Sequence, residues 1–468
     1  MYHSNQKEIM KKLLYIAKIA LVFFLFGCES NLNVQPVASI DANEAIKDAN
    51  GLNSALNGLY NDFQSDSYYG RDLFILNELS ANDGKRTGTS LDYQQFENHS
   101  ILSDNANIES LWSSAFGAIN TANNIIERAT PIEMDEATKE NIIGEAYFLR
   151  TLAHFDMVKL YGGIPYKSKS TQGVSDEINA ARISVEETYN LMLADLLVAK
   201  EKVTIEKGNF FVNPVAIDAL LARVELYYAS YLLQMGGDSE VHFQKALTYA
   251  EAVISSGKYE LEPAFGDVFT TKENTEVIFQ LNYSAQDRNR MSYYLSPISL
   301  GGRGEVTFST SLKNSYKGND LRSDFIFQDF PTLDGSATSK RVAKYQDTAN
   351  GADAIIILRL ADMYLIKAEA HFMLEGIAEQ DKILEAINEV RSRSNDPLVN
   401  LGSDPLKTIL DERRWEFCFE GHRWTDLVRT GRATNLLGIS KNATLYPLPL
   451  KEIQTNTNIN QEDQNPGY

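Results

Sequence analysis

The chain has 468 residues, with 63 acidic against 44 basic side chains and a formal net charge of −19. A chain this acidic, with no basic stretch to offset the charge, repels nucleic-acid phosphates, so we exclude nucleic-acid binding. Its length suffices for a large buried core, and its two cysteines are too few for a disulfide framework, so stability must come from packing.

The first predicted element is an export signal. Lys11 and Lys12 precede an apolar run over 13–26, and Gly27 and Cys28 follow it. The run is too short as a helix to cross a bilayer core of about 30 Å. Basic residues, a short apolar run and a small residue before cysteine are typical of a lipoprotein signal, so we predict that Cys28 is lipidated. The alternative is an ordinary cleaved signal in which this cysteine is a bystander.

Helical patterning begins at Asp41, after a polar tether. Apolar spacing predicts a first helix through Leu59, a second from about Asp104 to Thr130, and a third over 136–161, closed by two glycines. N-terminal caps predict the start of three later helices. These caps are Ser184 with Glu187 three residues on, Asn213 before Pro214, and Asp404 before Pro405.

Two later helix pairs resemble each other in their alanine spacing. The first has Ala219, Ala222 and Ala229 on one stripe and Ala246 and Ala250 on its partner. Residues 361–372 and 383–390 repeat the pattern. Small residues let helices approach closely, and stacked pairs of this length are typical of tetratricopeptide repeats. We therefore predict a mainly α fold with tetratricopeptide-like helix pairs.

Two segments lack this regularity. Residues 64–100 read as irregular and are rich in Tyr, Gly, Asp, Asn and Arg. Residues 259–354 lie between the two repeated helix pairs and read as a long insertion with short β-like runs such as 276–281. Long ordered insertions usually carry function, so we expect a ligand-facing side built from loops and short strands.

Four motifs then match one family in order along the chain: 111–126 (LWSSAFGAINTANNII), 145–165 (EAYFLRTLAHFDMVKLYGGIP), 411–431 (DERRWEFCFEGHRWTDLVRTG) and the ending 446–453 (YPLPLKEI) with 465–468 (NPGY). Together with the lipoprotein start, the chain resembles the SusD/RagB family of outer-membrane nutrient-binding lipoproteins of Bacteroidetes. The resemblance implies a domain organisation of a signal peptide at 1–27, an N-terminal SusD-like helical region at 28–258 and a C-terminal RagB/SusD region at 259–468, packed as one globular unit.

The resemblance also implies a function. Family members sit lipid-anchored on the outer membrane, facing the exterior, and cap a SusC-like TonB-dependent transporter. They bind an oligosaccharide, hand it over for import, and have no catalytic activity. Two alternatives stay open: a peptide-binding lid of a RagAB-like importer, and a purely structural transporter cap.

Candidate ligand contacts come from 64–100 and 282–308. Sugar recognition uses flat aromatic faces with Asp, Asn or Arg for the hydroxyl groups, and both segments combine these residues. Arginines would also suit an anionic sugar or a peptide carboxylate. Loop packing is the alternative role for any single tyrosine. The candidates are Tyr68, Tyr69, Arg71, Asp83, Arg86, Tyr93, Tyr283, Arg288, Tyr293 and Tyr294.

The remaining charged motif residues are predicted to be structural. Arg150, Asp156, Arg413, Glu416 and Glu420 lie at helical spacing, which indicates ion pairs between and within helices. The tryptophans fall on the same motifs and are expected in the core. No histidine pair has metal-ligand spacing, and no nucleophile elbow or phosphate loop is present, so we predict no metal, no cofactor and no enzyme activity.

The lipoprotein signal generates a direct test. We expect the Cys28→Ser protein in the soluble fraction, because without acyl chains the processed chain has no stable anchor. Fractionation followed by immunoblotting measures this. Unchanged recovery of Cys28→Ser in the membrane pellet would rule out the lipid anchor.

Overall fold

The computed structural model describes residues 42–171, 179–395 and 398–468, so the predicted signal peptide and Cys28 lie outside the described residues. Contacts separate residues 1–45 from residues 46–468, and all packing below lies within the second group. The α-helices are α2 (Ala42–Ala45), α3 (Ala49–Gln64), α4 (Asp72–Ser80), α5 (Leu91–Glu97), α6 (Ala106–Arg128), α7 (Glu136–Tyr161), α8 (Val185–Lys202), α9 (Pro214–Met235), α10 (Glu240–Ser255), α11 (Asp267–Thr270), α12 (Met291–Leu295), α13 (Thr310–Ser315), α14 (Leu321–Ile326), α15 (Leu360–Glu375), α16 (Gln380–Arg391), α17 (Pro405–Phe417), α18 (Arg423–Arg429), α19 (Ala433–Leu437) and α20 (Leu450–Thr455). The 3₁₀ turns are η2 (Ile298–Leu300), η3 (Gly376–Glu379), η4 (Ser392–Ser394), η5 (Lys441–Thr444) and η6 (Gln461–Asp463). The strands are β1 (Gly84–Arg86), β2 (Val277–Leu281), β3 (Val306–Phe308), β4 (Phe327–Pro331), β5 (Thr338–Val342) and β6 (Ile355–Arg359).

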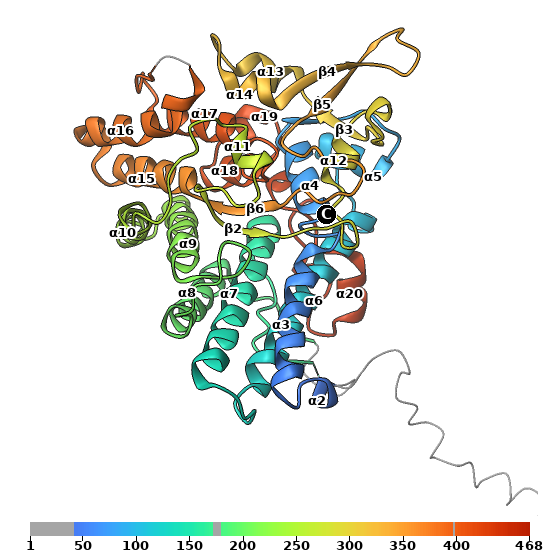
Figure 1. Cartoon of the computed structure of the whole chain (residues 1–468), viewed down its shortest axis with the longest axis vertical. Coiled ribbons are helices and arrows are strands. Elements are labelled where there is room, and N and C mark those ends of the chain that lie inside the picture. Colours follow the sequence, from blue (N-terminus) through green and yellow to red (C-terminus); the bar gives the residue numbers. More distant parts are fainter. Residues whose placement is uncertain (1–41, 172–178, 396–397) are drawn as a thin grey trace, which may run out of the picture. The chain divides into compact units, whose positions relative to one another are not determined.

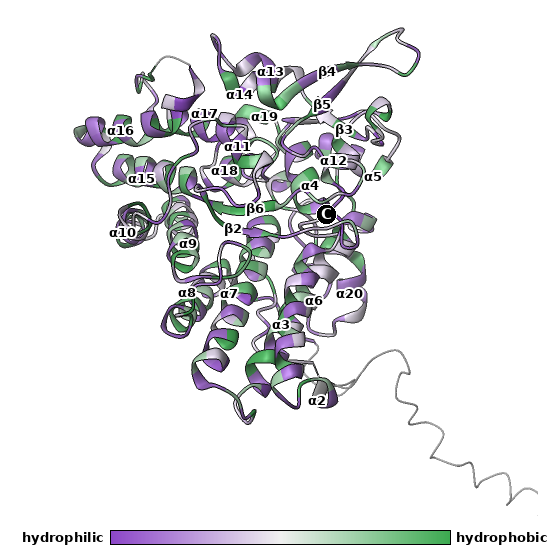
Figure 2. Ribbon diagram, in the orientation of Figure 1, coloured by the Kyte–Doolittle hydropathy of each residue, from purple (hydrophilic) through white to green (hydrophobic). Residues whose placement is uncertain are grey.

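The scaffold is a continuous array of helices in which each packs on the next, in the order α3, α6, α7, α8, α9, α10, α15 and α16 (Figure 1). They form the tetratricopeptide-like pairs α3/α6, α7/α8, α9/α10 and α15/α16, of which the last two are those that alanine spacing predicted. Figure 2 shows hydrophobic and hydrophilic stretches alternating along these helices, as expected where one face of each is buried. Helix α7 is buried along most of its length because α3, α6, α8 and α9 all contact it. Among the described helices, none is long and apolar enough to cross a membrane.

The predicted caps mark the starts of α8, α9 and α17 and the end of α7. The side chains of Ser184, Asn213 and Asp404 each accept a hydrogen bond from a first-turn N–H of α8, α9 and α17. Gly162 caps the C-terminus of α7, and its φ of 74° is accessible to glycine without strain. These local signals gave correct helix starts because they depend only on neighbouring residues.

The expectation that 64–100 is irregular is wrong in part, because the segment contains α4, α5 and the short strand β1. All nine residues of α4 are buried. A helix buried on every side shows no amphipathic period, so its sequence lacks the signal on which the prediction depended.

The insertion 259–354 contributes short antiparallel strands and small helices. The β-like run at 276–281 forms β2, which pairs with β6 immediately before α15. Strands β4 and β5 pair with each other, while β3 pairs with β1 from the N-terminal half. The insertion is therefore tied at one end to the helix array and at the other to α4 and α5 (Figure 1).

A buried network of ion pairs, the α17 network, joins the insertion to the last helices. Glu416 on α17 contacts Arg322 at 2.9 Å and Arg359 and Arg393 at 2.6 Å each. Acidic and basic members are equal in number, so their charges cancel. The members are Asp320, Glu276, Glu412, Glu416 and Glu420 with Arg322, Lys344, Arg359, Arg391 and Arg393.

A second balanced network also includes a residue of α17. Arg413 contacts Asp362 on α15 and Asp426 on α18, each at 2.8 Å. Arg223 from α9 pairs with Asp362, while Arg429 pairs with Asp426 and with Glu369. The predicted structural role of Arg413, Glu416 and Glu420 is thus confirmed.

The other motif residues are structural as well. Arg150 pairs with Asp195 at 2.7 Å and joins α7 to α8. The tryptophans are in the interior, with exposed fractions of 5% for Trp112, 8% for Trp415 and 0% for Trp424. No tryptophan is left to form a ligand platform.

Removing one carboxylate from the α17 network should destabilise the fold strongly. We expect Glu416→Gln to lower the free energy of unfolding by about 3–5 kcal/mol, because three buried arginines lose a shared counter-charge. Chemical denaturation measures the change.

A matched control lies on the same helix. Asp411 pairs with Lys407 at the solvent-exposed face, so Asp411→Asn should cost less than about 1 kcal/mol. Equal losses in the two variants would contradict the dominant role given to the buried network.

Candidate functional site

The two tyrosine- and arginine-rich segments, distant in sequence, lie side by side. Strands β1 and β3 pair from Gly84 opposite Phe308 to Arg86 opposite Val306. The Arg290 N–H donates to the Gly70 carbonyl at 2.9 Å, which joins the segments again. The two candidate segments, 64–100 and 282–308, therefore contribute to one continuous surface.

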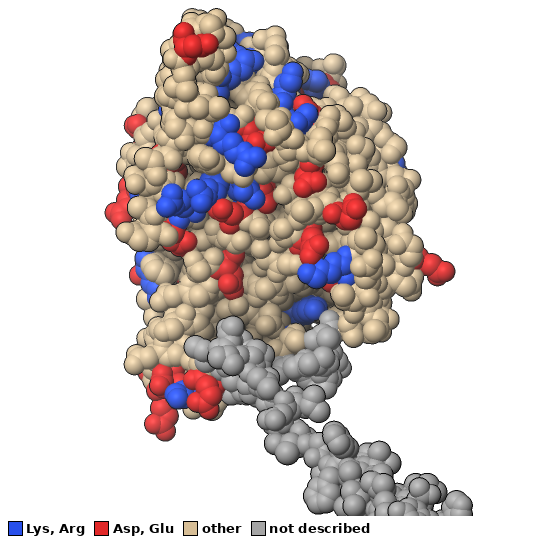
Figure 3. Space-filling model, turned by 90° about the vertical axis from the view of Figure 1, so that its right-hand side faces the viewer, with Lys and Arg blue, Asp and Glu red and all other residues tan. Residues whose placement is uncertain are grey.

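An Arg–Tyr cluster occupies this surface; we use the name for Arg71, Arg290, Tyr293, Tyr294 and Arg303. The Arg71 and Arg303 guanidinium carbons lie 4.6 and 5.3 Å from the centre of the Tyr294 ring. The Tyr293 ring meets Tyr294 edge-on at 5.8 Å. Both rings are half-buried and so keep some surface open to solvent. Figure 3 shows Lys and Arg gathered across the face that carries α5, α12 and β3.

A polar groove of about 560 Å³ lies next to the cluster, between the end of α3, one face of α6 and the loop before α12. Arg290 borders both features, since it bonds Asp66 in the groove at 3.3 Å and lies 5.9 Å from the Tyr293 ring. The lining is almost entirely polar and consists of Asn61, Asp62, Gln64, Ser65, Asp66, Ser114, Gly117, Gln286, Asp287, Arg288 and Arg290. Carboxylates, amides and guanidinium groups in this density suit a ligand with many hydroxyl groups.

The electrostatics of the groove favour hydrogen bonding over strong charge attraction. Burial raises the pKa of Asp62, Asp66 and Asp287 above the ordinary value, and the nearby arginines partly offset the rise at Asp66. The acids remain good acceptors at neutral pH. Gly117 leaves open space on the α6 face, because a Cβ there would meet nothing within 4 Å.

Five of the predicted ligand residues are buried and bonded within the protein. The Tyr68 and Tyr69 hydroxyls both donate to Asp156 at 2.8 Å. Tyr93 donates to Asp72 at 3.0 Å, and Tyr283 donates to the backbone of α3. Asp83 accepts from Arg414. With exposed fractions of 0–4%, these side chains offer a ligand no face, and their hydrogen bonds support the surface from within.

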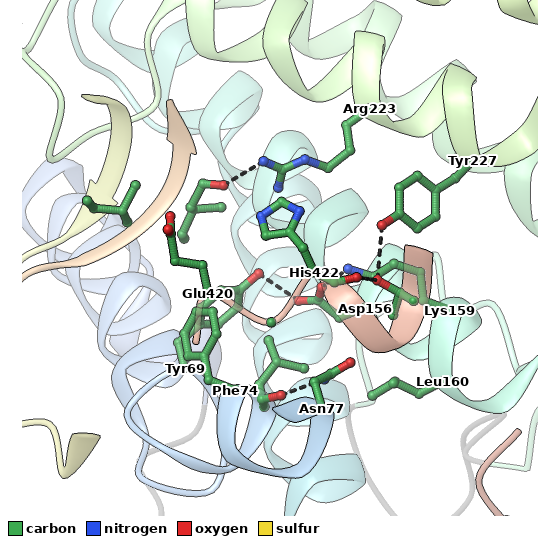
Figure 4. A pocket seen from close by; sticks show the side chains of 15 residues that line it. Tyr69, Phe74, Asn77, Asp156, Lys159, Leu160, Arg223, Tyr227, Glu420 and His422 are labelled. Carbon is green, nitrogen blue, oxygen red and sulfur yellow. Dashed lines mark hydrogen bonds and ion pairs between the residues drawn. The ribbon is translucent and has the colours of Figure 1, made fainter. Parts of the chain in front are cut away.

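Tyr69 lines a narrow cavity of about 30 Å³ (Figure 4). Asp156, Lys159, Arg223 and His422 converge on the same space from α7, α9 and the turn before α18. This volume fits about one water molecule and is far too small for a sugar ring. The cavity is therefore an internal junction rather than a ligand site.

The other predicted residues keep accessible positions. Arg71, Tyr293 and Tyr294 belong to the Arg–Tyr cluster, and Arg288 is exposed at the groove. Arg86 is half-buried beside the cluster, where it donates to the Gly88 carbonyl at 2.7 Å. The groove residues on α3 and α6 were missed, because polar side chains on a helix look the same in sequence whether they face a groove or open solvent.

Near this surface, burial changes the pKa of one further acidic side chain, Glu78. Glu78 on α4 is 1% exposed, and its Oε1 accepts from the Gly421 N–H at 3.2 Å. Its Oε2 has no hydrogen-bond partner among the described residues. Burial, reinforced by the nearby Asp83 carboxylate, raises the pKa of Glu78 to about 8.

Comparisons with known proteins agree with this architecture. Two family models match the chain: the SusD family over residues 332–444, and a SusD-like family described as starch-binding and associating with the outer membrane over 32–226. SusD-like protein P38 of Formosa agariphila is 26% identical, over 97% of this chain and 99% of its own.

Solved structures share the fold. Surface glycan-binding protein A from Bacteroides fluxus superposes with a TM-score of 0.74 at 24% identity, over 90% of this chain and 99% of its own. A laminarin-binding SusD-like protein superposes with a TM-score of 0.76 at 22% identity, over 90% of this chain and 100% of its own.

The raised pKa of Glu78 predicts a pH-dependent effect of Glu78→Gln. The folded wild type prefers the protonated acid, so its stability falls as pH rises from about 4.5 towards 8, whereas glutamine stays neutral. As pH rises from 5 to 9, we expect the free energy of unfolding of Glu78→Gln to increase by about 3–5 kcal/mol relative to that of wild type, because each unit of pKa shift corresponds to about 1.4 kcal/mol.

Urea denaturation at each pH measures the difference, with Glu273→Gln reporting the loss of one exposed charge. A pH-independent difference between Glu78→Gln and wild type would show that Glu78 is ionised in the fold throughout this range.

Proposed function

The chain belongs to the SusD/RagB family, and from this premise we propose that it is a cell-surface lipoprotein that binds a nutrient oligosaccharide and delivers it to a SusC-like TonB-dependent transporter. Proteins of this family are binding proteins rather than enzymes. The family-level description of starch binding and outer-membrane association supports the class of ligand and the compartment. Anchoring through Cys28 and an outward-facing orientation are further parts of the proposal.

The polar groove beside the Arg–Tyr cluster carries the proposal. A sugar presents hydroxyl groups that need planar hydrogen-bonding partners and C–H faces that pack on aromatic rings. The groove supplies the first through Asp62, Asp66 and Gln286, and Tyr293 and Tyr294 supply the second at its edge. We propose that the oligosaccharide runs from the polar groove to the rings of Tyr293 and Tyr294, with Arg290 between the groove and the rings.

A peptide ligand remains the second candidate because of the arginines. Arg288 is exposed at the groove, and Arg290 is only partly occupied by Asp66, so together they suit a carboxylate. The lining of the groove contains no large apolar side chain against which the apolar side chains of a peptide could pack, and this favours the sugar. A purely structural cap would need neither feature.

The groove generates a matched pair of variants at one position. We expect Gly117→Trp to abolish binding of whichever glycan the wild-type protein binds, because the indole fills the open space on the α6 face of the groove. Gly117→Ala should bind normally, since its Cβ meets nothing within 4 Å. Tyr293→Ala should weaken binding by about 3–10-fold through lost stacking.

Isothermal titration against soluble starch, laminarin and a peptide pool measures these effects, and circular dichroism checks the fold. Heat with peptides alone would overturn the sugar assignment. Glycan binding that is unchanged in Gly117→Trp would place the site elsewhere. Co-purification with a transporter, without binding of any ligand, would favour the structural cap.

A further inference from the structure

A separate cavity of about 400 Å³ shares no lining residue with the polar groove. It lies where the ends of α7 and α9 and the start of α8 meet α18, α19 and η5. Its lining consists of Val158, Lys159, Gly162, Val185, Tyr189, Tyr227, Tyr231, Gln234, Met235, Thr425, Val428, Arg429, Gly431, Ala433, Thr434, Lys441, Thr444 and Leu445. This volume lies within the range of small-molecule sites in proteins.

The walls of this cavity are mostly apolar. Val185, Val428 and Leu445 line it together with the aromatic rings, and Met235 keeps 58% of its surface exposed. Unlike the groove, the lining has no carboxylate and only one side-chain amide, Gln234, so it offers a sugar few of the planar acceptors that the groove supplies. The cavity is therefore chemically unlike the groove and suits an apolar body.

The charge of the lining is one-sided. It includes Lys159, Arg429 and Lys441 but no carboxylate, in a chain with 63 acids and 44 bases. The carboxylates that pair with Lys159 and Arg429 lie outside the lining. Lys441 is exposed at the rim and has no ion pair within the described ranges. The cavity thus favours a negative group near its mouth.

Tyr189 adds an unused hydrogen-bond donor. Its ring is 4% exposed and stacks on Tyr228 with centroids 5.0 Å apart. Its hydroxyl has no hydrogen-bond partner in the described parts of the chain. Burial raises the pKa of Tyr189 above its ordinary value, so the hydroxyl remains a neutral donor at physiological pH. Buried Tyr hydroxyls usually have a partner, and Tyr189 is one of the residues that line the cavity.

We propose that this cavity binds an amphipathic organic anion, a small molecule with a planar aromatic or branched apolar body and one carboxylate or sulfonate group. The body packs against Tyr231, Val428 and Met235. The anionic group lies within reach of Lys441, and one of its oxygens accepts a hydrogen bond from the Tyr189 hydroxyl. This site is independent of the proposed glycan site.

The test uses two fluorescent probes that differ chiefly in charge: 1-anilinonaphthalene-8-sulfonate (ANS), an aromatic anion, and N-phenyl-1-naphthylamine (NPN), its neutral counterpart. We expect saturable binding of ANS by the wild-type protein, weakened by added NaCl. Lys441→Gln and Tyr189→Phe should each weaken ANS about 3–10-fold and leave NPN unchanged, since they remove a charge or a hydroxyl without changing the apolar walls.

Thr434→Trp fills the cavity and should abolish saturable binding of both probes, while Lys317→Gln, an exposed lysine outside the lining, should leave both unchanged. The absence of saturable ANS binding to wild type would overturn the proposal. So would ANS affinity that is unaltered in both Lys441→Gln and Tyr189→Phe, two variants that keep the packing even if the tryptophan variant fails to fold.

Discussion

The mutual neutralisation of buried charges around α17 is the constraint on which the rest of the structure depends. Burying a single arginine without its partners costs several kcal/mol, so each cation in the network fixes the position of the acids around it. The acids come from α17 and the turn after it and from the residues directly before β2 and α14. The cations come from the insertion, β6, α16 and η4. Because Glu416 alone serves three arginines, the insertion, the last helix pair and α17 have one mutually consistent arrangement.

This arrangement decides where ligands meet the protein. The helix array supplies fixed ends and faces, and the charge network fixes the insertion against them. The insertion in turn contacts α4 and α5 through β1 and β3, which brings Arg71 against Tyr294. The polar groove and the apolar cavity then differ because different helices of the array line them, α3 and α6 for the groove and α7, α8 and α9 for the cavity. One is lined by exposed polar helix faces, and the other lies where aromatic residues of α8 and α9 meet α18.

The sequence predicted the features that depend on local patterns. Caps such as Asn213 gave helix starts, alanine spacing gave the helix pairs, and charges at helical spacing on α17 indicated ion pairing. It did not predict α4, whose full burial removes the periodic signal. Tyrosine composition marked the correct surface but not the correct residues. Tyr68 and Tyr294 have similar surroundings in sequence, and only tertiary packing turns the first towards Asp156 and leaves the second beside solvent. Likewise, the position of Gly117 in the groove depends on the packing of α6 against α3, which its sequence neighbours do not reveal.

The position of α17 late in the chain has a consequence for biogenesis. Arg322, Arg359 and Arg393 leave the ribosome before α17, and only Asp320 and Glu276 among the acids of the network precede that helix. The earlier segments therefore acquire most of their counter-charges only when synthesis is nearly finished. Contacts between such distant segments form slowly, because loop closure precedes them. A nascent chain with this layout stays loosely packed over its C-terminal half until late, and a prematurely terminated product that lacks α17 retains uncompensated cations, which makes it a ready substrate for quality-control proteases.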